Sequence, residues 1–333
     1  RVLNCQAEQA AVAAEVEAWS VDQLEAEVVA EGGCAAAMRT LADWQSHPNG
    51  AAVRGERLID QVSGAPTASD WSPANPNRPL AGIRILDLTR VLAGPVCTRF
   101  LSGWGAEVLR IDPPDWNEGI VIPEVVLGKR CARLDLKTDA GLDVLERLLS
   151  EADVLVHGYR SDALEGLGLG EERRSHIRPG LIDVCLDAYG WTGPWAARRG
   201  FDSLVQMSCG IADAGMKVAG HDAPFPLPVQ ALDHATGYLM AAAAVRALRT
   251  RQIDGHGTRI RCSLARTAEL LVTGPVGDLE AEIDRGSEAD WSTEPEITSW
   301  GSARRLIPPG RADGLQMSWA IPAGELGRHP PAW

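Results

Sequence analysis

The sequence predicts an α/β fold whose larger part is a Rossmann-like parallel sheet. Two observations lead to this prediction. Short apolar runs of strand type alternate with helical patterns, and such alternation is typical of right-handed βαβ units. A stretch rich in Pro, Ser and Asn, residues 63–78, lies ahead of the first of these runs and has the composition of a linker between domains.

Before the linker, residues 5–31 predict two helices, because their apolar residues recur close to the helical period. Ser20-Val-Asp-Gln23 has the form of a capping box at the start of the second helix. Gly32 and Gly33 end that helix, since glycine is favoured just after a helix.

After the linker, strands are predicted at 83–88, 106–111, 132–136, 154–157 and 181–188. Pro95 fits the first turn of a helix after the first strand, and residues 140–151 form a helix before the fourth. The longest predicted helix, 233–250, is rich in Ala and Leu and leads into a strand at 259–263. Residues 300–333 are rich in Pro and Gly and predict an extended tail.

Composition excludes several classes of partner. The formal net charge of −13 would repel nucleic acid, and no Lys/Arg run opposes this. No apolar stretch is long enough to cross a membrane. The seven cysteines are scattered without metal-binding spacing, which is typical of reduced thiols and predicts a cytoplasmic protein. The chain does not start with Met, so we expect it to begin part-way through a gene product.

A dinucleotide-binding enzyme would need G-x-G-x-x-G in the turn after the first strand. That turn, Thr89 to Pro95, contains one glycine followed by proline. Asp112 lies at the end of the second strand, where a ribose-binding acid belongs, but it fits a plain strand-end residue equally well. Paired metal-binding histidines and the G-x-S-x-G motif of serine hydrolases are absent from the sequence.

Two local patterns could carry chemistry. Gly128-Lys129-Arg130 places adjacent cations at a loop-to-strand junction, where they could bind phosphates or form a solvated basic turn. Asp233 stands at the head of the long helix and fits an N-cap. The helix dipole would keep its carboxylate ionised, as covalent catalysis on an acyl carbon requires.

Several segments, taken in order, resemble the family III CoA-transferases, which include formyl-CoA transferase, carnitine CoA-transferase and the related alpha-methylacyl-CoA racemases. The match extends almost continuously over residues 79–265. The matching stretches are Pro79–Pro95, Gly105–Pro114, Gly128–Lys137, Ala152–Arg160, Leu164–Gly170, Gly190–Pro194, Gly200–Asp202 and Ala231–Gly237.

The resemblance implies a role for each matching residue. Asp233 falls on the catalytic aspartate, which in the transferases attacks the thioester and forms an aspartyl intermediate. The implied contacts with CoA are Arg90, Val91, Lys129, Arg130, Gly158, Tyr159, Arg160, Leu167 and Arg199. Acyl-CoA and a small carboxylic acid would be the substrates, and no tightly bound cofactor or metal is expected.

One departure from the family pattern narrows the chemistry. The racemases place a histidine where this chain has Phe201, and two-base proton exchange at the α-carbon would then lack its second base. CoA transfer is therefore favoured over racemisation or epimerisation of a 2-methylacyl-CoA. A non-catalytic acyl-CoA-binding protein is a third alternative.

The resemblance also predicts the domain organisation. Residues 1–62 resemble part of a smaller α/β domain, 63–78 form the linker, 79–272 form the CoA-binding large domain, and 273–333 form a return segment. This order is permuted relative to the family, in which the small domain follows the large one. The family also implies a homodimer of interlocked chains.

Overall fold

The computed structural model describes residues 2–67, 71–72, 75–159, 163–274, 286–308 and 310–333. Its contacts divide the chain into two compact units. Unit 1 combines Arg1–Leu58, Asp187–Leu232 and Cys262–Gly274, and unit 2 combines Ile59–Leu186, Asp233–Arg261 and Pro275–Trp333. Residues 79–272 contribute to both units, so the predicted four-part division stays a prediction.

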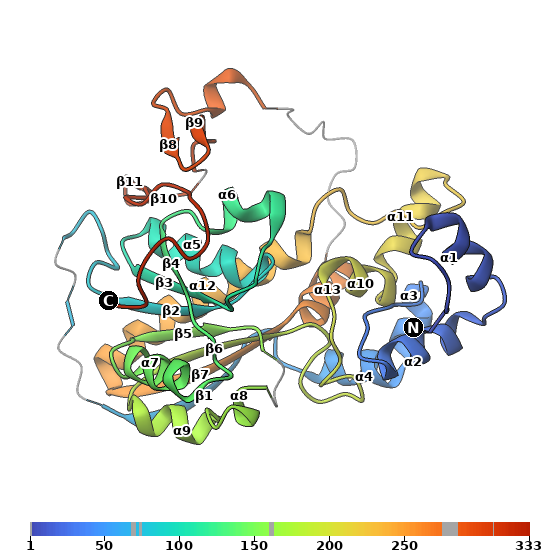
Figure 1. Ribbon diagram of the computed structural model, residues 1–333, viewed down its shortest axis with the longest axis horizontal. Helices are drawn as coiled ribbons and strands as arrows, with labels where there is room; N and C mark the ends of the chain where they lie inside the picture. Colours follow the sequence, from blue (N-terminus) through green and yellow to red (C-terminus); the bar gives the residue numbers. More distant parts are fainter. Residues whose placement is uncertain (1, 68–70, 73–74, 160–162, 275–285, 309) are drawn as a thin grey trace. The chain divides into compact units, whose positions relative to one another are not determined.

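Unit 2 contains a seven-stranded sheet in the order β1-β7-β6-β5-β2-β3-β4 (Figure 1). Its strands are β1 (Asp60–Pro66), β2 (Arg84–Leu88), β3 (Glu107–Asp112), β4 (Lys129–Arg133), β5 (Val154–His157), β6 (Ile182–Asp187) and β7 (His256–Ser263). The five strands β6, β5, β2, β3 and β4 run parallel, whereas β1 pairs antiparallel with β7. The predicted α/β fold with a Rossmann-like parallel sheet is confirmed. The predicted linker begins inside β1, which forms one edge of this sheet.

The helices of unit 2 are α5 (Ala93–Gly103), η1 (Gly119–Val121), α6 (Ile122–Val125), α7 (Asp139–Ser150), α8 (Ala163–Gly166), α9 (Glu171–Ile177) and α12 (Ala231–Asp254). Apolar side chains from alternate strand positions, among them Leu86, Leu109 and Leu155, form a core with Leu145 of α7. Alternate side chains of a strand point to opposite faces, so Asp87 and Arg110 lie on the other face. Figure 1 shows α7 and α9 on one side of the sheet and α5 on the other.

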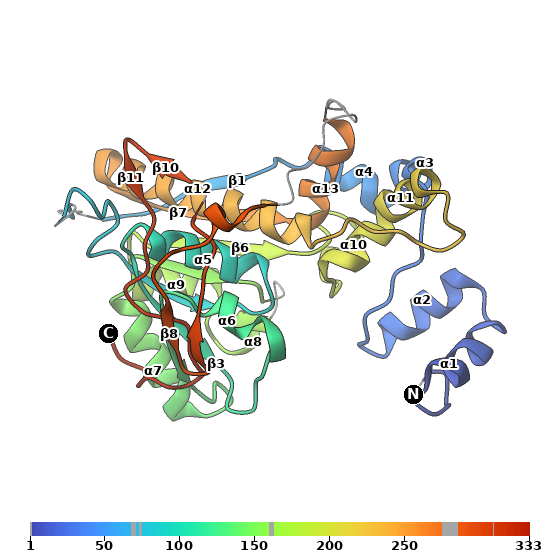
Figure 2. The same cartoon turned by 90° about the horizontal axis from the view of Figure 1, so that it is seen from above.

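The C-terminal segment of unit 2 contains two small hairpins, β8 (Glu296–Thr298) with β9 (Gly301–Ala303) and β10 (Arg311–Ala312) with β11 (Leu315–Gln316), besides η2 (Glu288–Asp290). Its last residues lie along β4, an edge strand of the sheet, and Figure 2 shows the C-terminus close to α7. The His329 amide donates to the Cys131 carbonyl at 2.9 Å, and the Cys131 amide donates to His329 Nδ1 at 2.9 Å. Trp333 then donates to the Leu148 carbonyl of α7 at 3.0 Å.

The elements that lie wholly in the described part of unit 1 are helices. They are α1 (Gln9–Val16), α2 (Val21–Ala30), α3 (Leu41–Ser46), α4 (Pro48–Gly55), α10 (Asp202–Ser208), α11 (Ile211–Ala219) and α13 (Leu264–Thr273). The predicted cap of α2 is observed, since the Gln23 amide donates to Ser20 Oγ at 3.4 Å. Buried Glu25 accepts from Arg39 at 2.5 Å and from Arg198 at 2.7 Å, which ties three separate segments together. None of the helices in the described residues of the whole chain is both long and apolar enough to span a bilayer.

The turn after β6, also in unit 1, is built on two carboxylates. Asp187 Oδ1 accepts the amides of Tyr189 and Gly190 at 2.7 and 2.9 Å. Glu56 Oε1 accepts the amides of Trp191 and Thr192 at 2.7 and 2.9 Å. Burial raises the pKa of Asp187 to about 8, although the two backbone hydrogen bonds oppose the rise.

The variant Asp187→Asn tests the assignment of a raised pKa to Asp187. In the unfolded chain Asp187 ionises near pH 3.9, so between about pH 4 and 8 the unfolded state binds fewer protons than the folded state. Stability should therefore fall as the pH rises through that window, by up to about 1.4 kcal/mol per pH unit from this group. The variant keeps the hydrogen-bond acceptor, and its urea midpoint should exceed that of the wild type at pH 8 and match it near pH 4. A constant difference between the two proteins across this range would contradict the assignment.

Candidate functional site

The strand order places a topological switch point between β2 and β5. The chain passes from β2 outward to β3 and β4 and returns to β5 on the other side of β2. In open α/β sheets, ligands bind outside the carboxyl ends of the strands at such a point. Leu88 and His157 are register partners at these two ends, so the loops that follow β2 and β5 start side by side.

The loops after β2, β3 and β5 meet around the Arg90 side chain. Its guanidinium lies 4.7 Å from the Trp116 ring centroid and 5.4 Å from that of Tyr159. It also donates to Tyr159 Oη at 2.8 Å. The predicted CoA contacts Arg90 and Tyr159 are thus brought together, from positions 69 residues apart. The cation between two rings is held in one orientation, which suits recognition of a planar or anionic group.

Val91 has a strained backbone. Its φ of 66° lies in the left-handed region, which a β-branched residue rarely adopts. Its amide donates to Glu118 Oε1 at 2.5 Å, and this hydrogen bond to a carboxylate helps to hold the conformation. Such strain costs about 1–3 kcal/mol and clusters at functional sites. The Val91 side chain is 39% exposed at the sheet edge, where the resemblance places CoA.

Glu118 is itself held by a buried ion-pair network. Arg110 has no exposed surface and donates two hydrogen bonds of 2.9 Å to Asp112 and one of 2.7 Å to Glu118. Burial alone would lower the pKa of Arg110, but its hydrogen bonds to Asp112 and the charges of both acids outweigh burial and raise that pKa. Asp112 therefore serves as a structural partner of Arg110, not as a ribose-binding acid.

A second buried ion pair lies on the same face of the sheet. Asp87 accepts hydrogen bonds from Lys129 Nζ at 3.0 Å, from Thr98 Oγ1 at 2.6 Å and from the Thr89 hydroxyl at 2.5 Å. Burial would raise the pKa of Asp87, but the charges of Lys129 and Arg110 and the hydroxyl donors outweigh it and lower that pKa. Asp87 is therefore a buried carboxylate anion that fixes the start of the β2–α5 loop.

The structure places Lys129 and Arg130 differently from the predicted pair of accessible cations. The strand begins at Lys129, so the two side chains point to opposite faces of the sheet. Lys129 has no exposed surface, and its ammonium group is bonded to Asp87 and to the Pro95 carbonyl at 3.1 Å. Arg130 is half-buried. Lys129 thus positions the β2–α5 segment, whereas a contact between Arg130 and CoA stays a prediction.

Asp233 lies in the first turn of α12 and is 6% exposed. The prediction of an N-cap was wrong, because the helix already begins at Ala231. One turn later on the same side is Gly237, where a side-chain Cβ would lie only 2.5 Å from the Ala93 carbonyl oxygen. This close approach places the second turn of α12 against the start of α5, the helix that follows the loop with Arg90 and Val91.

The remaining predicted residues are more dispersed. Gly158 is exposed, and no heavy atom lies within 4 Å of the place its Cβ would occupy. Leu167 is half-buried and packs against the apolar core that includes Leu145 of α7. Arg160 lies outside the described residues. Arg199 is exposed in unit 1 and donates to the Gly32 carbonyl at 3.2 Å, and Phe201, in the same unit, is 47% exposed.

Sequence reasoning missed Trp116 and Glu118, which complete this edge of the sheet. Both follow β3, and loops after neighbouring parallel strands open on the same edge. That rule could have selected residues 113–118 as soon as the second strand was assigned.

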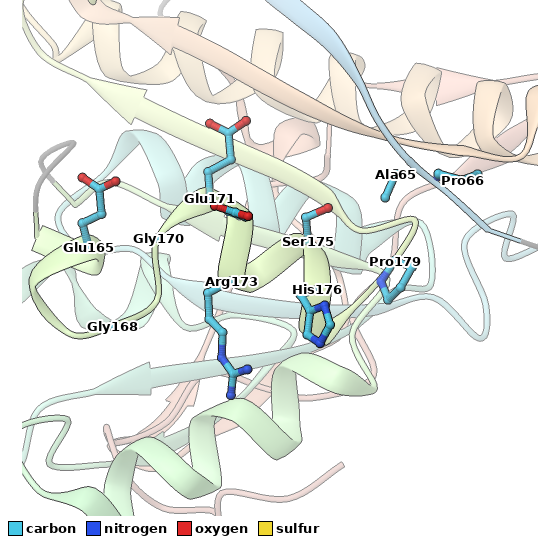
Figure 3. Close-up of a pocket in the computed structure, with 11 residues that line it drawn as sticks. Ala65, Pro66, Glu165, Gly168, Gly170, Glu171, Arg173, Ser175, His176 and Pro179 are labelled. Atoms are coloured by element: carbon cyan, nitrogen blue, oxygen red, sulfur yellow. The ribbon is translucent and has the colours of Figure 1, made fainter.

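An open groove of about 1130 Å³ lies beside α9 (Figure 3). Glu165, Glu171 and Glu172 line it, and Arg173 turns toward α7, where it pairs with Glu146 at 2.8 Å. Neither Asp233 nor any predicted CoA contact within the described residues lines this groove, so we do not assign it as the site.

The fold and this edge define a Rossmann-like α/β protein of the class in which ligands bind at the carboxyl ends of the strands. The chain belongs to CoA-transferase family III, whose family model matches residues 80–290.

Two curated relatives and one solved structure illustrate the similarity. The human succinyl-CoA:glutarate CoA-transferase is 32% identical over 74% of this chain and 56% of its own length. An acyl-CoA transferase of Fusarium pseudograminearum is 31% identical over 69% of this chain and 52% of its own length. The crystal structure of Rv3272 from Mycobacterium tuberculosis superposes with a TM-score of 0.55 at 32% identity, over 59% of this chain and 57% of that one. The chain spans 35% to 56% of the length of these and other curated relatives.

Lys129→Met tests the buried ion pair. The substitution leaves Asp87 as an unpaired buried charge and should lower the free energy of unfolding by about 3–5 kcal/mol in urea titrations. Arg130→Met, at the adjacent half-buried position, should cost less than about 1 kcal/mol. The double variant Asp87→Asn/Lys129→Met should recover part of the loss. Equal urea midpoints for Lys129→Met and the wild type would refute the structural role.

Proposed function

We propose that this chain moves coenzyme A between an acyl-CoA and a carboxylic acid, with Asp233 as the carboxylate that forms the covalent intermediate. The observation that carries the proposal is the buried position of Asp233 in the first turn of α12, one turn before the contact of Gly237 with the start of α5. Membership of CoA-transferase family III supports the reaction class. The names of the relatives support an acid as acceptor, since glutarate and (R)-2-hydroxy-4-methylpentanoate occur in them.

The position of Asp233 suits a nucleophile. Burial strips water from the carboxylate, while the amide dipoles of the first helical turn favour its negative charge. In the proposed first step, an Asp233 oxygen attacks the thioester carbonyl, the carbon–sulfur bond breaks, and CoA leaves as a thiolate. The thiolate then attacks the Asp233 carbonyl of the resulting anhydride, releases the first acid and leaves an aspartyl-CoA thioester. The acceptor carboxylate then attacks the aspartyl-CoA thioester and releases the CoA thiolate. The thiolate attacks the acceptor carbonyl of the new anhydride, which gives the new acyl-CoA and frees Asp233.

Arg90, Val91 and Gly158, which belong to the proposed CoA contacts, lie in the loops after β2 and β5 at the edge described above. Arg90 would meet an anionic or planar part of CoA, and Val91 and Gly158 would allow close approach, because both are exposed. Arg130, Tyr159, Arg160, Leu167 and Arg199 complete the proposed set. Lys129 would act through Asp87 and the β2–α5 loop.

We further propose a cytoplasmic homodimer without a tightly bound cofactor. The seven cysteines are free, which supports a reducing compartment. Sedimentation at a mass near 36 kDa would contradict the dimer.

Asp233→Asn tests the proposed nucleophile. Transfer of CoA from acetyl-CoA or succinyl-CoA to added carboxylic acids, followed by chromatography, should fall at least about 1000-fold. The wild type, mixed with acyl-CoA and quenched with hydroxylamine, should carry a hydroxamate on the peptide that contains Asp233. Asp213→Asn is a matched control, because Asp213 occupies the third position of α11 and is 7% exposed. Full activity of Asp233→Asn, or a wild type that exchanges CoA without this adduct, would exclude the covalent role.

A further inference from the structure

A second group of reactive side chains lies on the neighbouring strands β5 and β6. Cys185 Sγ is 3.5 Å from His157 Nδ1, and His157 Nε2 is 3.2 Å from Asp183 Oδ1. His157 and Cys185 are register partners, and Asp183 is two residues earlier on the same face of β6. This face is opposite to the one that carries Asp87 and Lys129, because Leu88, the register partner of His157, alternates with Asp87. We call Cys185, His157, Asp183 and Arg174 the thiol cluster.

Arg174 of α9 fixes the far end of the thiol cluster. It donates to Asp183 Oδ2 from Nε at 2.9 Å and from a terminal nitrogen at 2.6 Å. Its other terminal nitrogen donates to the Leu169 carbonyl at 2.6 Å. Burial would raise the pKa of Asp183, but the hydrogen bond from His157 and the charge of Arg174 lower it overall. Asp183 is therefore an anion held in one orientation.

The orientation of Asp183 sets the proton positions on the imidazole. An anionic carboxylate accepts, so Nε2 of His157 carries the hydrogen that points to Asp183. Nδ1 then presents a lone pair to the Cys185 thiol and can accept its proton. Nucleophile, base and orienting carboxylate thus follow each other at hydrogen-bond range, which is the arrangement of cysteine nucleophiles activated by a histidine.

Two other buried thiols show the effect of burial on the pKa of a cysteine. Burial raises the pKa of Cys209 and of Cys262 to about 12, which keeps these thiols protonated and inert. Cys185 is 6% exposed and has the His157 imidazole beside its sulfur. Gly158, which follows His157, is exposed, and no heavy atom of the described residues lies within 4 Å of the place its Cβ would occupy. The described residues contain no group of three or more His, Cys, Asp or Glu side chains arranged to hold a metal ion, so metal binding does not account for the cluster.

We propose that Cys185, activated by His157 and Asp183, is a second nucleophile of this chain and accepts an acyl group from an acyl-CoA thioester. The proposal rests on the proposed function only in requiring that the chain bind acyl-CoA. In the step, the thiol proton passes to His157 Nδ1 as the sulfur attacks the thioester carbonyl carbon. The bond from that carbon to the CoA sulfur breaks, and the CoA thiolate takes the proton from His157. The products are an acyl thioester on Cys185 and free CoA, with no change of oxidation state.

The test follows acylation in an Asp233→Asn background, which removes the proposed aspartyl adduct. After incubation with acetyl-CoA or succinyl-CoA, intact mass and peptide mapping should show one acyl group on the peptide that contains Cys185. Adding Cys185→Ser should abolish the label, whereas adding Cys262→Ser should leave it. His157→Gln removes the base and should slow labelling at neutral pH at least about 100-fold, with the rate recovering as the pH rises and thiolate forms.

The outcomes separate this proposal from the proposed function. CoA exchange by the wild type without acyl transfer to Cys185 would overturn the second nucleophile and leave the proposed function standing. Acylation of Cys185 without CoA exchange would support the second nucleophile and overturn the proposed function. Labelling of His157→Gln at the wild-type rate would refute the activation by His157. If a variant fails to fold, labelling of the unaltered chain still decides whether Cys185 accepts an acyl group.

Discussion

The buried Asp87–Lys129 ion pair is the constraint on which the site depends. Two charges with no contact with water are tolerated only when each is bonded to partners, and Asp87 has four hydrogen bonds from Thr89, Thr98 and Lys129. These bonds join β2 to α5 and to β4. Because these bonds fix Thr89, the first residue of the β2–α5 loop, they also fix the position from which Arg90 and Val91 follow.

The two faces of the sheet are stabilised by different interactions. Leucines on one face pack against α7, and ion pairs on the other lie under α5. Apolar packing tolerates small shifts, whereas paired charges demand fixed geometry. The thiol cluster is a set of fixed polar groups on the apolar face, where it lies on β5 and β6.

The sequence predicted the parallel sheet because buried parallel strands are short continuous apolar runs, and β5 was predicted at its observed residues. It could not predict the partner of Lys129, since Asp87 lies 42 residues earlier and only the folded sheet brings them together. Local pattern likewise suggested a cap at Asp233, and the helix starts two residues sooner. The stacking of Arg90 on Trp116 depends on the course of a loop, which periodicity does not determine.

The last residues of the chain protect the sheet as well as completing it. An edge strand presents unpaired amides and carbonyls to which a strand of another molecule can add, and this is a common start of aggregation. His329 occupies both backbone groups of Cys131 on β4, one with its own amide and one with its ring. The last residues of the chain therefore cover the edge of the sheet at Cys131, where a strand of another molecule could otherwise add.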